Sequence, residues 1–323
     1  MTHPVLLVGL GAIGMGYDFD HADDRAYTHA RALQSHAAFG PVCAVDPDAA
    51  RRDAFVARYG GRACATLGEA LASGVPEIVI IATPTATHAS LLREILQAGA
   101  PRAVLCEKPL APDPAEARQM LEACEARGVS LYVNYMRRAE PGAVAVRDML
   151  ADGRIATPLR GVVWYSKGVG HNGSHFIDLL RFWLGDVAEA RLVRAGRRWQ
   201  DSDPEPDFVL DHARGSVSYL AAREECFSHY TVELIAPNGR LYYAQGGETI
   251  SWQGLVSDPE FAGYTVLDAT PRPLATDMRR YQWHVLEQLR IALAGGAATL
   301  CTGRDALQTL GDVFRVTDQL RGN

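Results

Sequence analysis

Residues 5–14 read VLLVGLGAIG, a run of four apolar residues that leads directly into a glycine-rich turn. An uninterrupted apolar run of this length is typical of a strand buried on both faces of a parallel sheet. The G-x-G-x-x-G motif that follows predicts a tight turn at Gly9, close approach of a bound pyrophosphate at Gly11 and close helix–strand packing at Gly14. This stretch therefore predicts the first strand and turn of a dinucleotide-binding domain.

The pattern around this stretch repeats as far as about residue 135. Short apolar runs predict further strands at residues 41–46, 77–82, 103–106 and 129–134. Between them, apolar residues at three- and four-residue spacing predict helices at residues 30–38, 48–59, 85–98 and 113–127. Strands that alternate with helices of this length predict βαβ units, and hence the doubly wound parallel sheet of a Rossmann domain.

After residue 138 the pattern changes. Helices are expected at residues 140–151, 172–184, 276–294 and 302–320, and the region from about residue 185 to 255 shows the alternation of half-buried strands. Pro237-Asn238-Gly239 separates two of these runs and predicts a hairpin turn. We therefore expect an α/β protein with a Rossmann domain over residues 1–138. Residues 139–323 are expected to form an α+β domain with a large, mainly antiparallel sheet.

Composition excludes several classes of protein. The 323 residues are 48% hydrophobic and 22% charged, which is ordinary for a globular chain. A net charge of −6 gives no reason to expect nucleic-acid binding. No apolar stretch reaches the roughly 18 residues that span a bilayer, and the N-terminus does not resemble a signal peptide. Six scattered cysteines without a C-x-x-C pair suit a reducing compartment, so a cytoplasmic protein is expected.

Asp46 is the expected ribose-binding residue of the dinucleotide site. It ends the second predicted strand, where an acid accepts the adenosine ribose 2′-OH and repels a 2′-phosphate, which favours NAD. Arg51 and Arg52 lie just downstream and keep NADP as the alternative. The pyrophosphate is expected against backbone N–H groups of the turn, which includes Ala12 and Ile13.

The spacing between the glycines and this acid is unusual. Gly14 and Asp46 are 32 residues apart, whereas about 20 is common. Residues 15–27, MGYDFDHADDRAY, account for the excess. This segment is either a tolerated surface insertion or a loop that covers the cofactor or lines the substrate cleft.

Three further segments carry polar side chains. ATPTATH at 82–88 and CEKP at 106–109 each follow a predicted strand, so both are expected at the carboxyl edge of the sheet, where ligands bind in open α/β folds. The third segment is GHNGSHFIDLL at 170–180.

With these motifs the chain resembles the Gfo/Idh/MocA family of oxidoreductases (glucose–fructose oxidoreductase, inositol dehydrogenase and relatives) over essentially its whole length. The resemblance is carried by THARAL at 28–33, EKPL at 107–110, NYMRR at 134–138 and GSHFIDLL at 173–180. It implies NAD(P)-dependent hydride transfer at a hydroxyl or keto carbon of a sugar, polyol or nucleotide sugar. It also implies a homodimer or homotetramer formed through the outer face of the antiparallel sheet.

The resemblance assigns catalytic roles to three residues. Lys108 matches the lysine of the family's E-K-P motif, and His175 matches the histidine of the later motif. Asp178 matches the trailing acid of that motif and is expected to orient a neighbour. The family's first motif acid is replaced here by His171, so either His171 or His175 is the proton-transfer residue.

The remaining expected site residues fall into two groups. The dinucleotide is expected to contact Gly9, Gly11, Ala12, Ile13, Gly14, Asp46, Thr83, Pro84, His88, Glu107, Lys108 and Asn134. The substrate is expected to contact Lys108, Arg137, Tyr165, Lys167, His171, Asn172 and His175. The cations in this group, with Arg138 and Arg181, suggest an anionic group on the substrate; alternatively they pair with Glu140, Asp178 and Asp186.

Other interpretations stay open. His171, His175 and Asp178 have the i, i+4, i+7 spacing of metal ligands on one helix face, but Asn172-Gly173 predicts that the helix begins after His171, so no metal is expected. His29 and His88 are also typical of packing residues at helix N-termini, and Phe182 and Trp183 of a core. The alternative functions are an NAD-retaining redox-cycling lyase or glycosidase, and a dinucleotide-binding sensor without activity.

Overall fold

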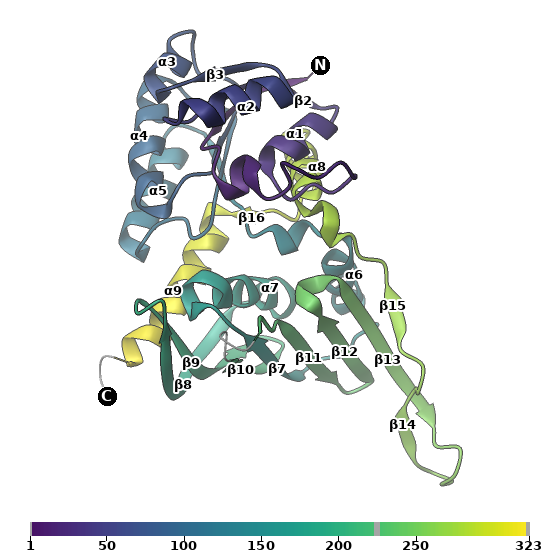
Figure 1. Cartoon of the computed structure of the whole chain (residues 1–323). Coiled ribbons are helices and arrows are strands. Elements are labelled where there is room, and N and C mark those ends of the chain that lie inside the picture. The colour runs from purple at the N-terminus through teal and green to yellow at the C-terminus, as the bar shows by residue number, and fades with distance from the viewer. Residues whose placement is uncertain (1, 223–226, 321–323) are drawn as a thin grey trace. The chain divides into compact units, whose positions relative to one another are not determined.

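The computed structural model describes residues 2–222 and 227–320, and the chain divides into two compact units (Figure 1). Unit 1 comprises Met1–Ala139 and Arg279–Gln308, and unit 2 comprises Glu140–Met278 and Thr309–Asn323. Cys226, one of the six cysteines, lies outside the described residues.

Unit 1 is built on a seven-stranded sheet with the order β16-β6-β5-β4-β1-β2-β3. Its strands are β1 (His3–Val8), β2 (Phe39–Val45), β3 (Arg62–Cys64), β4 (Ile78–Ile81), β5 (Ala103–Cys106), β6 (Ser130–Val133) and β16 (Cys301–Thr302). All neighbouring strands are parallel except β16 and β6. This order confirms the predicted doubly wound sheet, and its switch point lies between β1 and β4.

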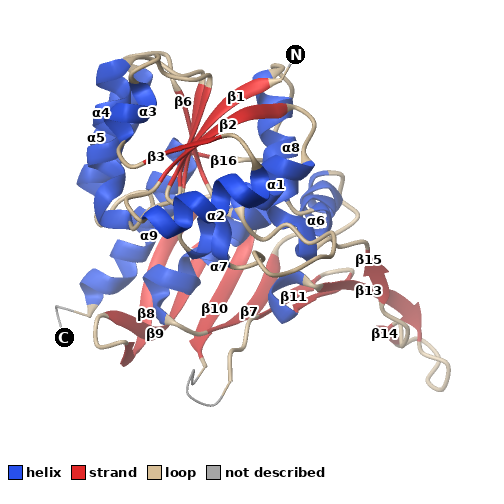
Figure 2. Cartoon of the chain, turned by 45° about the horizontal axis from the view of Figure 1, so that its top comes forward, coloured by secondary structure: helices blue, strands red, loops and turns tan. Residues whose placement is uncertain are grey.

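Helices cover both faces of this sheet. They are α1 (His29–Ser35), α2 (Ala49–Tyr59), α3 (Leu67–Leu71), α4 (His88–Ala98), α5 (Pro114–Glu125) and α8 (Tyr281–Leu293). Figure 2 shows α1, α2 and α8 on one face and α4 and α5 on the other. Asp48 and Asp113 cap α2 and α5 by accepting hydrogen bonds from backbone N–H groups, which satisfies donors that a helix start leaves unpaired. The short β3 and α3 have no counterpart among the predicted elements.

Residues 279–308 belong to unit 1, whereas the sequence pattern suggested one domain over residues 139–323. The reason is packing. Val285, Leu286 and Leu289 on α8 join the buried core of the Rossmann sheet, and β16 extends that sheet beside β6. The helical pattern of residues 276–294 shows that one face is buried but not which core it joins.

Unit 2 contains a nine-stranded sheet with the order β14-β13-β12-β11-β7-β10-β9-β8, and β15 pairs with β13. The strands are β7 (Leu159–Tyr165), β8 (Val187–Trp199), β9 (Asp203–His212), β10 (Gly215–Ala221), β11 (Thr231–Ala236), β12 (Gly239–Ala244), β13 (Thr249–Ser257), β14 (Thr265–Leu267) and β15 (Arg272–Leu274). Every pairing is antiparallel except β7 with β10. The predicted turn joins β11 to β12.

One face of this sheet is covered by α6 (Pro141–Ala151), α7 (Ser174–Leu184) and part of α9 (Gly303–Gln319). Trp183 lies in this core, as expected, and its indole N–H donates to the Ala143 carbonyl at 2.9 Å. The opposite face carries exposed apolar side chains, including Trp164 and Ile235. Within the described residues, no helix combines the length and apolarity that crossing a membrane requires.

Candidate active site

The glycine motif forms a tight turn between β1 and a short π-helical segment, Ala12–Gly16. Gly9 has φ +102°, and a Cβ there would lie 2.5 Å from the Ala82 carbonyl oxygen. A Cβ on Gly14 would lie 2.1 Å from the Gly9 oxygen. A Cβ on Gly11, in contrast, would meet no heavy atom within 4 Å. The turn is therefore closed by packing at Gly9 and Gly14, and is open at Gly11, where a pyrophosphate is expected to approach.

Asp46 follows β2 and is buried, with a side chain that braces the glycine turn. Its Oδ2 accepts from the Leu10 N–H at 2.8 Å, and its Oδ1 accepts from the Asp48 N–H at 2.9 Å. The half-exposed Arg51 places Nη1 3.7 Å from Oδ2. Asp46 thus holds the turn in shape and keeps a carboxylate at the carboxyl end of β2.

His88 is fully buried at the start of α4. Its Nε2 lies 2.9 Å from the Thr83 carbonyl and its Nδ1 lies 3.1 Å from the Leu110 carbonyl. The ring therefore ties the loop after β4 to the loop after β5. Any contribution of His88 to dinucleotide binding passes through the position of Thr83, because the ring has no exposed surface.

Glu107 is the centre of a buried polar network next to Lys108. Its Oε1 accepts from His29 Nε2 at 2.8 Å and from Asn134 Nδ2 at 2.6 Å. Asn134 also donates to Gln282 Oε1 at 3.1 Å, which links α8 to the network. Burial alone would raise the pKa of Glu107, but the hydrogen bonds and positive charge from His29, with smaller effects of Asn134 and Lys108, lower this pKa below its ordinary value.

This shift predicts how stability depends on pH. A carboxyl group with a lowered pKa in the folded state stabilises the fold above its unfolded pKa, near 4.5, and this stabilisation is lost as the pH falls. We expect Glu107→Gln to lower the free energy of unfolding by about 1–3 kcal/mol at pH 7. The difference should narrow below pH 4.5 in urea titrations. Glu122→Gln, on the exposed side of α5, is the control. A difference in the free energy of unfolding between the wild type and Glu107→Gln that does not change with pH would contradict this account.

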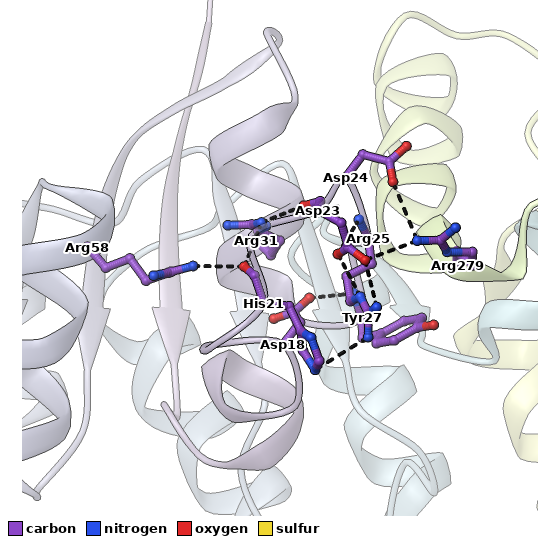
Figure 3. A network of polar contacts seen from close by, with 9 residues as sticks. All are labelled: Asp18, His21, Asp23, Asp24, Arg25, Tyr27, Arg31, Arg58 and Arg279. Atoms are coloured by element: carbon purple, nitrogen blue, oxygen red, sulfur yellow. Dashed lines mark hydrogen bonds and ion pairs between the residues drawn. The ribbon is translucent and has the colours of Figure 1, made fainter.

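Of the 15–27 segment that the spacing singled out, Met15 and Gly16 belong to the π-helical segment, and the rest forms a loop fixed to α1, α2 and the turn before α8. The fully buried Asp18 accepts from the N–H groups of Tyr27 and Thr28 at 2.7 and 3.1 Å. Figure 3 shows Arg279 reaching Asp23 (3.0 Å) and Asp24, and Arg31 and Arg58 donating to the His21 carbonyl at 3.0 and 3.1 Å. The segment leaves the glycine turn and ends just before the cap of α1, close to His29.

In unit 2 residues 166–173 connect β7 to α7, and Gly168–Gly173 form a short π-helical segment; we call residues 167–171 of this connection the loop before α7. Two carboxylates of β9 fix its backbone. Glu205 Oε1 accepts from the N–H of Lys167 at 2.8 Å, and Asp203 accepts from the N–H groups of Gly170 and His171 at 3.0 and 2.7 Å. The positions of Lys167 and His171 are therefore set through the main chain.

The polar side chains after this loop differ in exposure. His171 is exposed, and its ring stacks on Trp199 with centroids 4.9 Å apart. Asn172 donates to the Tyr230 hydroxyl at 2.9 Å. His175 is buried in the first turn of α7. Asp178, one turn further, accepts from the Thr309 hydroxyl at 3.2 Å in the interior.

The helix α7 begins at Ser174, and His171 lies in the short π-helical segment Gly168–Gly173 that leads into it. Among the described residues, no group of three histidine, cysteine or acidic side chains is arranged to hold a metal ion.

The structure corrects the prediction that Tyr165 contacts the substrate. Its side chain is fully buried in the core of unit 2, where its hydroxyl donates to the Pro206 carbonyl at 2.6 Å. Burial also raises the pKa of Tyr165 well above its ordinary value. The reason is that Tyr165 points to the face of the sheet that the helices of unit 2 cover. The neighbouring Trp164 points to the exposed face instead.

The cations proposed for an anionic substrate have different surroundings. Arg181 is buried and pairs with Asp312 and Asp186, both at 2.5 Å, so it is a structural residue. Arg138 lies 3.5 Å from Asp305. Glu140 caps α6, where its carboxylate accepts from the Ala143 N–H at 2.8 Å. Arg137 is also buried.

Several residues of both units were not expected from the sequence. They are Asp18, Gln282, Trp199, Asp203, Glu205 and Tyr230. One feature of the sequence could have identified Asp203 and Glu205, because two acids two residues apart on a strand lie on the same face of the sheet. Within each unit, packing brings the others to their partners from distant parts of the sequence.

Comparison with known proteins agrees with this geometry. Residues 5–135 match the family described as "Oxidoreductase family, NAD-binding Rossmann fold", GFO_IDH_MocA. A curated relative, the D-apiose dehydrogenase of Rhizobium rhizogenes, is 26% identical over an alignment of 219 residues, and the match covers 58% of this chain. The matched region spans only 61% of that relative's length.

Solved structures share the fold of the whole chain. An oxidoreductase from Agrobacterium radiobacter in complex with NAD+, L-tartaric acid and magnesium has a TM-score of 0.75 at 21% identity, covering 100% of this chain and 98% of the other. The 3-ketoreductase KijD10 from Actinomadura kijaniata, in complex with NADP and TDP-benzene, has a TM-score of 0.73 at 17% identity, covering 98% of both chains. The N-terminal Rossmann unit of this chain is therefore similar to the Gfo/Idh/MocA oxidoreductase family over residues 5–135, and the solved structures share the fold of both units.

Proposed function

We propose that this chain catalyses reversible hydride transfer between nicotinamide and a CH–OH carbon of a sugar or polyol. The observation that carries the proposal is that unit 1 contains both an open glycine turn and Lys108. Lys108 follows β5 on a loop that the buried Glu107 anchors. The match of residues 5–135 to this oxidoreductase family supports redox chemistry, and the D-apiose dehydrogenase relative suggests a carbohydrate substrate.

The residues of unit 1 fit a dinucleotide. The space at Gly11 leaves room for a pyrophosphate, and Asp46 keeps a carboxylate at the end of β2. Asn134 has a buried Oδ1 without a hydrogen-bond partner among the described residues, which is a site for a donor from a ligand. When bound, the nicotinamide supplies the hydride acceptor or donor.

The protein's own groups are proposed to bind and move the proton. Lys108 would hold the substrate hydroxyl through its amine and share its proton. The buried imidazole of His175 is the proposed proton-transfer group, because imidazole titrates near neutral pH. His171, whose backbone is fixed by Asp203 and whose ring stacks on Trp199, is the proposed substrate contact.

We propose NAD as the preferred cofactor, because the Asp46 carboxylate would repel the 2′-phosphate of NADP. Asp46→Asn should reduce the ratio of kcat/KM with NAD to kcat/KM with NADP by about tenfold, equivalent to about 1.4 kcal/mol. Asp48→Asn is the control, since it removes the same charge from the exposed cap of α2. Equal ratios in the wild type and in Asp46→Asn would contradict the preference.

The function is tested by following nicotinamide absorbance with NAD and NADP across D-apiose, other free sugars, inositols and nucleotide sugars. Both oxidation and reduction are measured. Turnover with one class of CH–OH substrate supports the proposal. Cofactor binding without turnover, together with cleavage of a glycosidic bond, would point to the redox-cycling lyase or glycosidase; binding alone would point to a sensor.

A further inference from the structure

The chain contains thirty arginines and only two lysines, Lys108 and Lys167. Both lysines lie in segments with site motifs, one in E-K-P and the other four residues before His171. Where a positive charge alone is needed on a surface, either residue serves, and this chain uses arginine. A lysine differs because its ammonium is compact, donates in three directions and can give up a proton, whereas a guanidinium is planar and always charged.

The backbone of Lys167 gives an independent observation. It has φ +65° and ψ +50°, in the left-handed region that residues other than glycine rarely adopt. Such a conformation persists only where the surroundings enforce it, and it is commonest at functional sites. The structure therefore keeps a lysine at a position where glycine or asparagine would be easier.

Glu205 enforces this conformation. Its side chain is almost fully buried, and its Oε1 accepts from the N–H groups of Lys167 at 2.8 Å and Gly168 at 3.3 Å. Arg197 Nε donates to its other oxygen at 2.6 Å, which satisfies the buried charge. These bonds use the main chain of Lys167, so they do not explain why residue 167 is a lysine.

Asp203 fixes the other end of the loop. It accepts from the N–H groups of Gly170 and His171, and it packs so closely on Gly168 that a Cβ there would lie 2.1 Å from its Oδ2. Two acids of one strand thus hold the main chain of residues 167–171. The loop is built to place the side chains of Lys167 and His171, and an elaborate backbone support of this kind is expected for a preorganised binding site.

We propose that Lys167 is a second functional lysine, a specificity-determining residue whose ammonium donates hydrogen bonds to hydroxyl or keto oxygens of a polyhydroxylated substrate. This inference rests on the proposed function. It favours uncharged oxygens over an anionic group, because a carboxylate or phosphate is bound better by the fork of an arginine, which this chain uses freely. A guanidinium at position 167 cannot replace the ammonium.

The first test compares Lys167→Arg with the wild type in turnover assays. We expect kcat/KM for the sugar to fall about 10- to 100-fold, the loss typical of a hydrogen bond to a charged group, while the KM for NAD stays within twofold. The melting temperature should not change, because Glu205 and Asp203 hold the main chain. Arg198→Lys, on the exposed strand β8, is the matched control for the exchange itself. Full activity in Lys167→Arg would overturn the inference.

Chemical rescue separates the role of the amine from an effect on folding. Lys167→Cys, alkylated with 2-bromoethylamine, gains a sulfur-containing analogue of lysine and should recover most of the lost kcat/KM. Alkylation with 2-chloroacetamidine, which creates an amidinium, should not restore it. Wild type treated with each reagent controls for the chain's own cysteines. Equal recovery with both reagents would contradict a specific requirement for an amine.

A third measurement does not depend on turnover. Reductive methylation with ¹³C-formaldehyde labels only two lysines and the N-terminal amine, and the Lys108→Arg and Lys167→Arg variants assign the signals. D-apiose or myo-inositol, added with NADH, should shift the Lys167 signal. If the wild type turns over no substrate, the proposed function fails, and a shift would still support a sugar contact at Lys167. If turnover occurs and the signal does not move at saturating sugar, only the inference about Lys167 fails.

Discussion

We expect Lys108→Met to lower kcat about 10²- to 10⁴-fold, the range that a positioned proton-transfer group contributes. The expected loss is in the chemical step, because the amine is proposed to hold the substrate hydroxyl and share its proton. The loop is held through Glu107 by His29 and Asn134, and both contacts stay in place in the variant. The Kd for NADH, measured by fluorescence, should therefore stay within about threefold, less than 1 kcal/mol.

Two comparisons make the result for Lys108 specific. Arg118→Met removes a positive charge from the exposed side of α5 and should leave kcat unchanged. Glu107→Gln should lower kcat in the wild type but not further in the Lys108→Met background, because it would act through Lys108. A Lys108→Met enzyme with more than a tenth of wild-type kcat would contradict the assigned role.

Gly11→Ala and Gly14→Ala are expected to have opposite effects. A Cβ at Gly11 meets nothing in the protein, and its φ of −71° suits alanine, so the melting temperature should stay within about 2 °C. The methyl group would occupy the space expected for the pyrophosphate and weaken NADH binding at least tenfold, about 1.4 kcal/mol. Gly14→Ala forces a Cβ to within 2.1 Å of the Gly9 oxygen and should destabilise unit 1 by about 1–3 kcal/mol or more.

The pair is measured by NADH titration and thermal unfolding of the same preparations. Gly68→Ala, where a Cβ also meets nothing within 4 Å, is the control away from the glycine turn. Gly11→Ala with wild-type affinity for NADH would show that the dinucleotide does not approach this position.

The fold was largely predictable because its signals are local. The apolar run before Gly9, the capping acids Asp48 and Asp113 and the Pro237-Asn238-Gly239 turn each act within a few residues, and the structure confirms them. Membership of α8 in unit 1 was not predictable, because an amphipathic pattern does not identify the core that buries it. The burial of Tyr165 was missed for a similar reason: alternation along a strand does not show which face the helices cover.

The candidate site was predictable only where motifs carry it. The E-K-P and H-x-x-x-H segments identify Lys108, His171 and His175 as candidates. The residues that fix them come from elsewhere. His29 on α1 bonds Glu107, Gln282 on α8 bonds His29 and Asn134, and β9 supplies the acids for the loop before α7. Hydrogen bonds between such distant residues leave no periodic signal in a single sequence.

The most direct test of the proposed function follows one hydrogen atom. A sugar or polyol that gives turnover is supplied with deuterium at the reacting carbon, with NAD, and the released cofactor is analysed by mass spectrometry. Direct hydride transfer predicts one deuterium in the reduced cofactor and one oxidised product for each cofactor reduced. Consumption of the substrate without deuterium in the released cofactor would contradict net oxidation and favour a cofactor-retaining reaction.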